Sequence, residues 1–219
     1  MITILHLYPR ELGINGDVGN VLALRRRAQW RGAEVRVVDH EVGAPLPEVA
    51  HLVHIGSGPL SAQQLVLDDL AAIAPTLRSW AADGVPFLAV AGGWQLLGRS
   101  LVLTDGTVLP GAEVLPSDAT LTDRRIVREV WSDDVAGFEN HGARTTVDGR
   151  PVEWPVARFG SSIATTLHGP FLPMNPTFAD ELLTVAADRA GVELGAAGES
   201  IALVDDYAAR SRRAIKGRL

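Results

Sequence analysis

The chain contains no cysteine among its 219 residues. Disulfides, thiolate metal sites and cysteine nucleophiles are therefore excluded from this polypeptide. Long apolar stretches are missing as well. No run approaches the roughly 18 residues needed to span a bilayer, and the N-terminus lacks the basic and apolar pattern of a signal peptide. We therefore expect a soluble cytoplasmic protein without membrane insertion.

Positive charge and lysine are also scarce. The formal net charge is −6 and the pI is near 5.5, which argue against a nucleic-acid-binding surface. Lys216 is the only lysine, a bias typical of GC-rich bacterial genomes. With 47% hydrophobic and 21% charged residues, the chain is predicted to form a single domain over residues 1–219. We expect no cofactor and no metal site.

The apolar pattern of the first hundred residues alternates between strand and helix periods. Strands are predicted at residues 2–7, 34–38, 51–55 and 86–90, and helices at 21–30 and 61–80. This alternation predicts a mostly parallel sheet flanked by helices. The second half is predicted to be mixed α/β, with β-rich segments at 101–109, 125–131 and 161–167 and helices at 178–190 and 201–213.

Residues 87–98, FLAVAGGWQLLG, have the layout of a nucleophile elbow, in which a strand, a tight turn and a helix follow one another. Ala91 occupies the position of the nucleophile. Gly92 and Gly93 let the backbone turn sharply, and the following helix directs amide groups and a positive dipole toward a ligand. Such a site favours an oxyanion, although any doubly wound α/β fold could contain this segment.

Three other segments combine rare residue types. They are L-Y-P with G-D-V-G-N within residues 7–20, G-F-E-N-H-G with R-T within 137–145, and L-H-G-P with L-P and N-P within 167–176. Together with the elbow, these segments resemble class I glutamine amidotransferases of the GatD and cobyric acid synthase type. The resemblance extends, with gaps, from Leu7 to about Pro176. It implies a flavodoxin-like α/β fold with a central, mostly parallel sheet.

The resemblance also implies glutamine hydrolysis by a cysteine nucleophile, but this chain lacks the cysteine. The family keeps a nucleophilic cysteine where Ala91 stands, and His168 takes the position of its catalytic base. In active relatives the thiolate would attack the carboxamide of glutamine, and ammonia would pass to a synthetase partner. The methyl group of Ala91 has no lone pair, so glutaminase activity of the cysteine type is expected to be absent.

Four further positions are assigned to substrate binding by the same resemblance. They are Arg125, Gly58, Gly92 and Gln95, with the amides of Gly58 and Gly92 as oxyanion donors. Residues 56–64, GSGPLSAQQ, depart from the family's G-G-G-Q-D-x-x-Q, which places glutamine recognition in doubt. No acidic residue follows His168, so the third member of a triad must come from elsewhere, with a partner chain as one source. Asp17 has a simpler interpretation as a helix cap.

Three functions fit these observations. The first, which we favour, is a catalytically inactive pseudo-glutaminase that serves as a binding subunit of a Mur-ligase-like synthetase. The second is a GatD-type glutaminase that supplies ammonia for amidation of a cell-wall precursor, with alanine in place of cysteine at position 91. The third is an elbow hydrolase with a serine nucleophile, for which Ser57, Ser61 and Ser161 are candidates, although no Gly-x-Ser-x-Gly elbow supports it.

Overall fold

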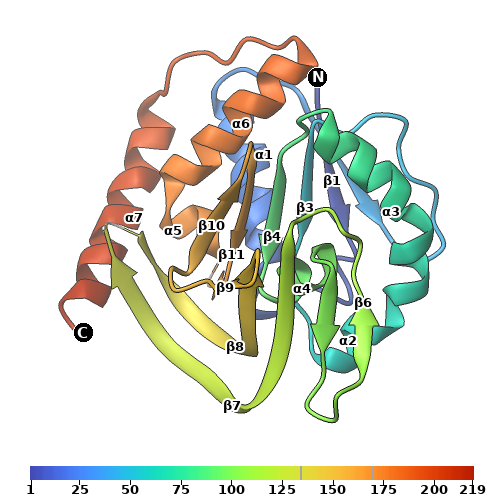
Figure 1. Ribbon diagram of the computed structural model, residues 1–219. Helices are drawn as coiled ribbons and strands as arrows, with labels where there is room; N and C mark the ends of the chain where they lie inside the picture. The colour runs from blue at the N-terminus through green and yellow to red at the C-terminus, as the bar shows by residue number, and fades with distance from the viewer. Residues whose placement is uncertain (134, 169) are drawn as a thin grey trace.

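The computed structural model describes residues 1–133, 135–168 and 170–219, so Gly169 of the L-H-G-P segment lies outside the described residues. Its first sheet has the strand order β10-β11-β4-β3-β1-β2 (Figure 1). All neighbouring strands are parallel except β10, which runs antiparallel to β11. The strands are β1 (Ile2–Leu7), β2 (Val35–His40), β3 (Leu52–Ile55), β4 (Phe87–Val90), β10 (Val156–Phe159) and β11 (Ser162–Thr165).

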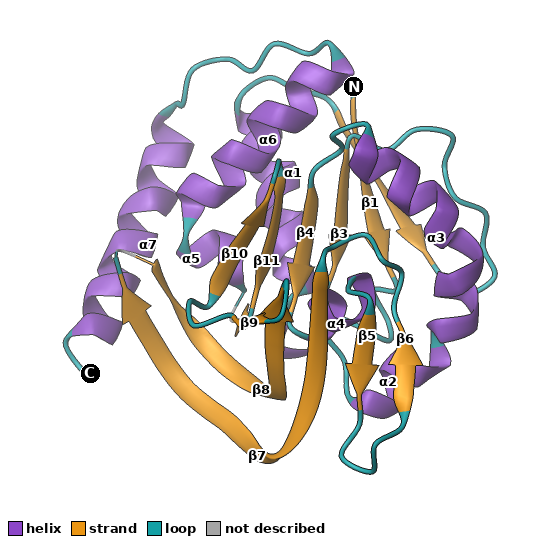
Figure 2. Cartoon of the chain, in the orientation of Figure 1, coloured by secondary structure: helices purple, strands orange, loops and turns teal. Residues whose placement is uncertain are grey.

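Helices cover both faces of this sheet (Figure 2). Side chains alternate along β1, so that Ile2 and Ile4 join one hydrophobic cluster while Leu5 and Leu7 join the other. The first cluster includes α1 (Val18–Trp30), α5 (Phe171–Met174) and α6 (Pro176–Ala190). The second includes α3 (Leu67–Ala82) and α4 (Gly92–Leu97). Burial on both faces explains why the inner strands β1, β3 and β4 are mostly apolar, whereas the edge strands β2 and β10 are partly exposed and carry charged residues.

A second sheet has the order β12-β8-β7-β5-β6, with β9 paired to β8. Its strands are β5 (Ser100–Val102), β6 (Val108–Pro110), β7 (Ser117–Ser132), β8 (Val135–Val147), β9 (Arg150–Pro151) and β12 (Leu167–His168). The long β7 and β8 sweep past the end of the first sheet at which its parallel strands finish (Figure 1). Elements from both sheets therefore meet at the end of β4, where the elbow was predicted.

Most predicted elements are present, with differences in detail. The helix predicted at 61–80 is two helices, α2 (Leu60–Leu65) and α3, separated at Val66. The segment predicted at 101–109 is a hairpin of β5 and β6, and the strand predicted at 125–131 is part of the longer β7. The predicted C-terminal helix is α7 (Glu199–Lys216). A single domain over 1–219 stays a prediction.

Asn175 and Pro176 have the residue types of a helix N-cap followed by proline in the first turn, but the side chain of Asn175 has another role. Asn175 does precede α6, but it makes no capping hydrogen bond. Its amide group instead bonds the backbone N–H and C=O of Ala136 at 2.9 and 2.7 Å, which ties the helix to β8. In the part of the chain that the structure describes, no helix is long and apolar enough to cross a membrane.

Candidate active site

Ala91 has the backbone conformation of an elbow residue, with φ 42° and ψ −100°. This region is unfavourable for any residue with a Cβ, and it persists only where surrounding contacts fix it. Here the Ala91 N–H donates to the Thr165 carbonyl at 2.7 Å, and the Ala91 carbonyl accepts from the Gln95 amide at 3.1 Å. The sharp turn also needs Gly93, because a Cβ there would lie 2.5 Å from the Gly56 oxygen.

A cavity of about 300 Å³ opens in front of this turn. Five of the six residues predicted for the site line it, namely Ala91, Gly92, Gln95, Gly58 and Arg125. The sixth, His168, is completely buried and is not among the lining residues. The fold therefore gathers positions that are far apart in the sequence, although their roles in binding stay predictions.

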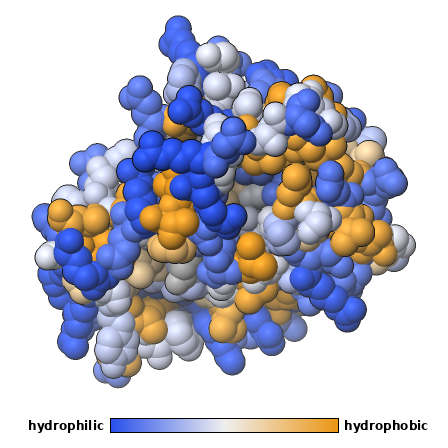
Figure 3. All heavy atoms as spheres, turned by 90° about the horizontal axis from the view of Figure 1, so that it is seen from below, coloured by the Kyte–Doolittle hydropathy of each residue, from blue (hydrophilic) through white to orange (hydrophobic). Residues whose placement is uncertain are grey.

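Seen from below, hydrophobic patches on this side of the molecule are separate and lie among hydrophilic side chains (Figure 3).

One wall of the cavity is an irregularity in β7. Leu121 pairs with Ala143 and Ile126 with His141, so the four residues 122–125 lie opposite Gly142 alone. An insertion of this kind bends a strand and redirects its side chains. Thr122 stabilises the bend, because its hydroxyl reaches the carbonyls of Arg124 and Gly142 at 3.0 and 3.1 Å.

Arg125 is directed across the cavity by this bend. Its Nε donates to Asn140 Oδ1 at 2.7 Å, and Asn140 Nδ2 donates to Asn15 Oδ1 at 3.4 Å. The guanidinium is therefore fixed by a neighbour on β8 while it remains exposed to solvent. A guanidinium held in this way can pair with a carboxylate.

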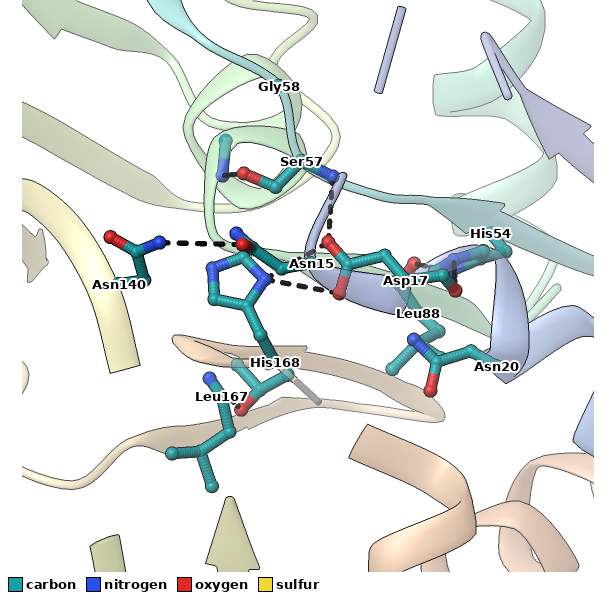
Figure 4. Close-up of polar contacts among 12 residues, drawn as sticks. Asn15, Asp17, Asn20, His54, Ser57, Gly58, Leu88, Asn140, Leu167 and His168 are labelled. Carbon is teal, nitrogen blue, oxygen red and sulfur yellow. Dashed lines mark hydrogen bonds and ion pairs between the residues drawn. The ribbon is translucent and has the colours of Figure 1, made fainter. Parts of the chain in front are cut away.

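His168 lies beside Asp17, and both side chains are completely buried (Figure 4). The His168 Nδ1 is 3.1 Å from each carboxylate oxygen of Asp17. Because a carboxylate accepts hydrogen bonds, this geometry assigns the imidazole proton to Nδ1 and leaves a lone pair on Nε2. His168 and Asp17 thus have the same relation as the histidine base and the acid that orients it in hydrolytic triads. The acid that the sequence lacks next to His168 is supplied from the same chain.

The interpretation of Asp17 as a helix cap is wrong, because its side chain makes no capping hydrogen bond to α1. Asp17, Gly19 and Asn20 of the G-D-V-G-N segment instead contact His168 and the start of α5. Asn20 Oδ1 accepts the Leu172 amide at 2.8 Å, and a Cβ on Gly19 would lie 2.7 Å from Pro170. The concentration of Asp, Asn and Gly in five residues was the signal for this role.

Buried polar atoms without a hydrogen-bond partner gather around the cavity. Among the described residues they include Gln63 Oε1, Gln95 Oε1, Asn15 Nδ2 and His168 Nε2. Gln63 is 6% exposed, and its Nε2 donates to the Gly58 carbonyl at 3.2 Å, so its oxygen is the free atom. Leaving such groups unpaired is costly, and the oxygens of Gln63 and Gln95, two residues that line the cavity, are free to accept a hydrogen bond from water or from a polar ligand.

The three candidate serines lie in different places. Ser57 lines the cavity, and its Oγ accepts the Gly92 amide at 3.1 Å. Ser61 is exposed, and Ser161 donates to the Gly84 carbonyl at another cavity. Ser57 precedes α2 rather than standing in the elbow between β4 and α4, so an elbow with a serine nucleophile is absent from the described residues.

Glu139 is a buried residue of the site region that the sequence reasoning did not single out. Burial alone would raise the pKa of Glu139, but hydrogen bonds from His141, Arg128 and Thr166 outweigh it and hold the pKa at about 2. The ionised carboxylate therefore anchors His141, which lines the cavity. Within the described residues, no group of three or more His, Asp and Glu side chains could hold a metal ion.

Residues 3–176 match the CobB/CobQ-like glutamine amidotransferase domain. The chain belongs to this family. The L-Y-P, elbow and L-H-G-P segments all fall inside the matched range, and this CobB/CobQ-like chain carries alanine where the resemblance places cysteine.

Two similar proteins bear the same name, lipid II isoglutaminyl synthase (glutamine-hydrolyzing) subunit GatD. The protein from Staphylococcus aureus (strain N315) is 31% identical over 210 residues, which cover 87% of this CobB/CobQ-like chain and 86% of that protein. The protein from Streptococcus pneumoniae is 28% identical over 211 residues, covering 86% and 81%. A probable cobyric acid synthase from Methanocella arvoryzae is 29% identical over 142 residues, covering 55% and 29%.

Solved structures agree on the fold. A crystal structure of a glutamine amidotransferase superposes with a TM-score of 0.51 at 15% identity, covering 84% of this chain and 98% of that one. The glutaminase domain of Trypanosoma brucei CTPS, solved with bound acivicin, also has a TM-score of 0.51, at 13% identity and coverages of 88% and 95%. The predicted flavodoxin-like fold of class I amidotransferases is thereby confirmed.

Proposed function

We propose that this chain is the amidotransferase-like subunit of a lipid II isoglutaminyl synthase and binds glutamine without hydrolysing it by the cysteine route. The observation that carries the proposal is Ala91, which holds the elbow conformation at the cavity but presents only a methyl group. Loss of the nucleophile from a catalytic triad reduces turnover on the order of 10⁶-fold. The pathway in this proposal is taken from the names of the similar GatD proteins.

Binding is supported by the groups around the cavity. The free oxygens of Gln63 and Gln95 can accept hydrogen bonds from an ammonium or amide group, and Arg125 can pair with a carboxylate. An amino acid with a side-chain amide supplies all of these groups. The partner in this proposal is a Mur-ligase-like synthetase, with the retained fold acting as its binding subunit.

Ammonia release and glutamine binding test the proposal together. The purified protein, alone and with the proposed Mur-ligase-like partner, is expected to release no ammonia from glutamine above the buffer background. Isothermal titration is expected to detect glutamine binding that weakens at least 10-fold in Arg125→Ala, because a carboxylate loses its charged partner. Arg124→Ala is the matched control, since Arg124 is exposed in the same bend but does not line the cavity. Robust ammonia release, or equal losses in the two variants, would refute the proposal.

An active GatD-type glutaminase is the second candidate, with cysteine as the functional residue at position 91. The buried pair of His168 and Asp17 favours it, because a base oriented by an acid is of use only to a group that it can deprotonate. Ala91→Cys separates the two. We expect the new thiol to react with a glutamine-analogue electrophile and yet to turn over glutamine poorly. Brisk ammonia release in the presence of the partner would support the second candidate.

A further inference from the structure

The hydroxyl of Ser57 is hydrogen-bonded to the amide that an oxyanion at this elbow would need. The Gly92 N–H follows the elbow residue directly, and it donates to Ser57 Oγ at 3.1 Å. Both residues line the cavity, and Ser57 is 7% exposed. The amide is therefore satisfied within the chain before any ligand arrives.

The backbone of Ser57 is held on both sides, so its hydroxyl is presented from a fixed position. The Ser57 N–H donates to Asp17 Oδ2 at 3.1 Å, and its carbonyl accepts from the Ile14 amide at 3.1 Å. In Figure 4 the amide of Ser57 faces the carboxylate, while its hydroxyl points away from it. Asp17 thus orients His168 and Ser57 together.

The loop that carries Ser57 also packs closely on Gly92. A Cβ built on Gly92 would lie 2.8 Å from Gln63 Nε2 and 3.1 Å from Ser57 Oγ. A ligand carbonyl that approached the Gly92 amide would have to displace the Ser57 hydroxyl from this confined place. Such an exchange replaces one hydrogen bond by another, so it adds little to binding.

We propose that Ser57 is a built-in occupant of the oxyanion site, which keeps the carbonyl oxygen of a bound amide away from Gly92. The site then binds intact amides reversibly and lacks one donor needed for acyl transfer, independently of the residue at position 91. The identity of the ligand rests on the proposed function, whereas the contact between Ser57 and Gly92 does not. Loss of one oxyanion donor reduces turnover by about 10²- to 10³-fold.

The first test follows the Gly92 amide by ¹⁵N NMR in the unaltered protein and in Ser57→Ala. The substitution should move the Gly92 amide proton upfield and accelerate its exchange before any ligand is added. Ser61→Ala, an exposed serine four residues further on, should leave the Gly92 resonance unchanged. An unchanged Gly92 resonance in folded Ser57→Ala would overturn the inference.

Adding glutamine extends the same experiment. Saturating glutamine should leave the chemical shift of the Gly92 amide proton unchanged in the unaltered protein and move it downfield in Ser57→Ala. The Kd for glutamine should be about 5-fold lower in Ser57→Ala, because the ligand gains one hydrogen bond from the Gly92 amide. An equal downfield shift in both proteins would overturn the inference. If neither protein binds glutamine, the proposed function fails, while the response of ligand-free Gly92 to Ser57→Ala still decides whether Ser57 occupies the amide.

A kinetic test uses the thiol background, assayed with the partner present. Ala91→Cys with Ser57→Ala should release ammonia from glutamine about 100-fold faster than Ala91→Cys alone, because the Gly92 amide becomes available to the oxyanion. Ala91→Cys with Ser61→Ala should match Ala91→Cys. Equal rates in Ala91→Cys with and without Ser57→Ala, whether measurable or at background, would count against the inference.

Discussion

The strained backbone of Ala91 has a measurable cost. At φ 42° and ψ −100° a residue with a Cβ loses about 1–3 kcal/mol, whereas glycine adopts this region readily. Ala91→Gly is therefore expected to leave the free energy of unfolding within about 1 kcal/mol of the unaltered protein, because strain relief offsets the lost methyl group. Ala89→Gly, in the regular part of β4, should lose roughly 2 kcal/mol. Urea unfolding measures both, and equal losses would contradict the strain at Ala91.

Two buried histidines make the stability sensitive to mild acid. His6 and His54 stack with their ring centroids 5.2 Å apart. Burial lowers the pKa of each from 6.5 to about 4, and for His54 the charge of His6 adds to the effect. Between these values the unfolded chain binds protons that the folded protein does not, so stability falls as the pH decreases from about 6.5 to about 4. Each histidine contributes a slope of about 1.4 kcal/mol per pH unit.

Denaturant unfolding between pH 7 and pH 4 checks this dependence. His6→Phe keeps an aromatic ring against His54 but removes one titrating group, so it should roughly halve the slope of stability against pH. A slope that stays the same in His6→Phe would show that other groups cause the dependence.

At the scale of whole elements, Arg27 joins three helices. This arginine of α1 is 4% exposed in its side chain, and its guanidinium lies 2.6 Å from both Asp180 on α6 and Asp205 on α7. Arg27→Ala should destabilise the protein by about 2 kcal/mol, since it removes charge-assisted hydrogen bonds from a buried guanidinium, while the two carboxylates left behind remain partly exposed to water. Arg25→Ala, exposed on the same helix, should change stability by less than about 0.5 kcal/mol. Thermal or urea unfolding that gives similar values for both would contradict this role.

The regular elements could be predicted from the sequence because their hydrophobic patterns are local. The inner strands β1 and β4 are buried on both faces and form short, mostly apolar runs, and α6 has proline in its first turn. The bend in β7 could not be predicted in this way. Its register depends on β8, and nothing within residues 122–125 shows that they lie opposite one glycine.

Site residues that belong to a sequence motif could be predicted, whereas contacts between residues far apart in the sequence could not. Ala91 was found from the elbow motif and Arg125 from the family resemblance, and both line the cavity. The pairing of His168 with Asp17 joins residues 151 positions apart, so no local spacing reveals it. The contact of Ser57 with Gly92 is hidden for the same reason, because a serine in a loop gives no sign of which amide its hydroxyl will meet.

At the scale of the whole molecule, the proposed role requires a partner. We expect this protein and the proposed Mur-ligase-like partner to sediment together in analytical ultracentrifugation, with a larger sedimentation coefficient than either alone. The reason is that the chain has no cysteine nucleophile, so in the proposed role it acts by binding to this partner. Independent sedimentation at micromolar concentrations of both proteins would contradict the expectation.

The cavity draws its walls from both sheets, since Gln95 follows β4 and Arg125 belongs to the bend in β7. A ligand that touches both side chains is therefore a reversible crosslink between the two sheets. The long antiparallel pair of β7 and β8 forms an arm, and a fluctuation that lifts this arm away from the first sheet must first release the ligand. The free energy needed to lift the arm therefore rises by about 2.7 kcal/mol at a ligand concentration 100 times the Kd. The arm becomes a reporter of occupancy, and its amide hydrogens should exchange with solvent about 100-fold more slowly when the site is full.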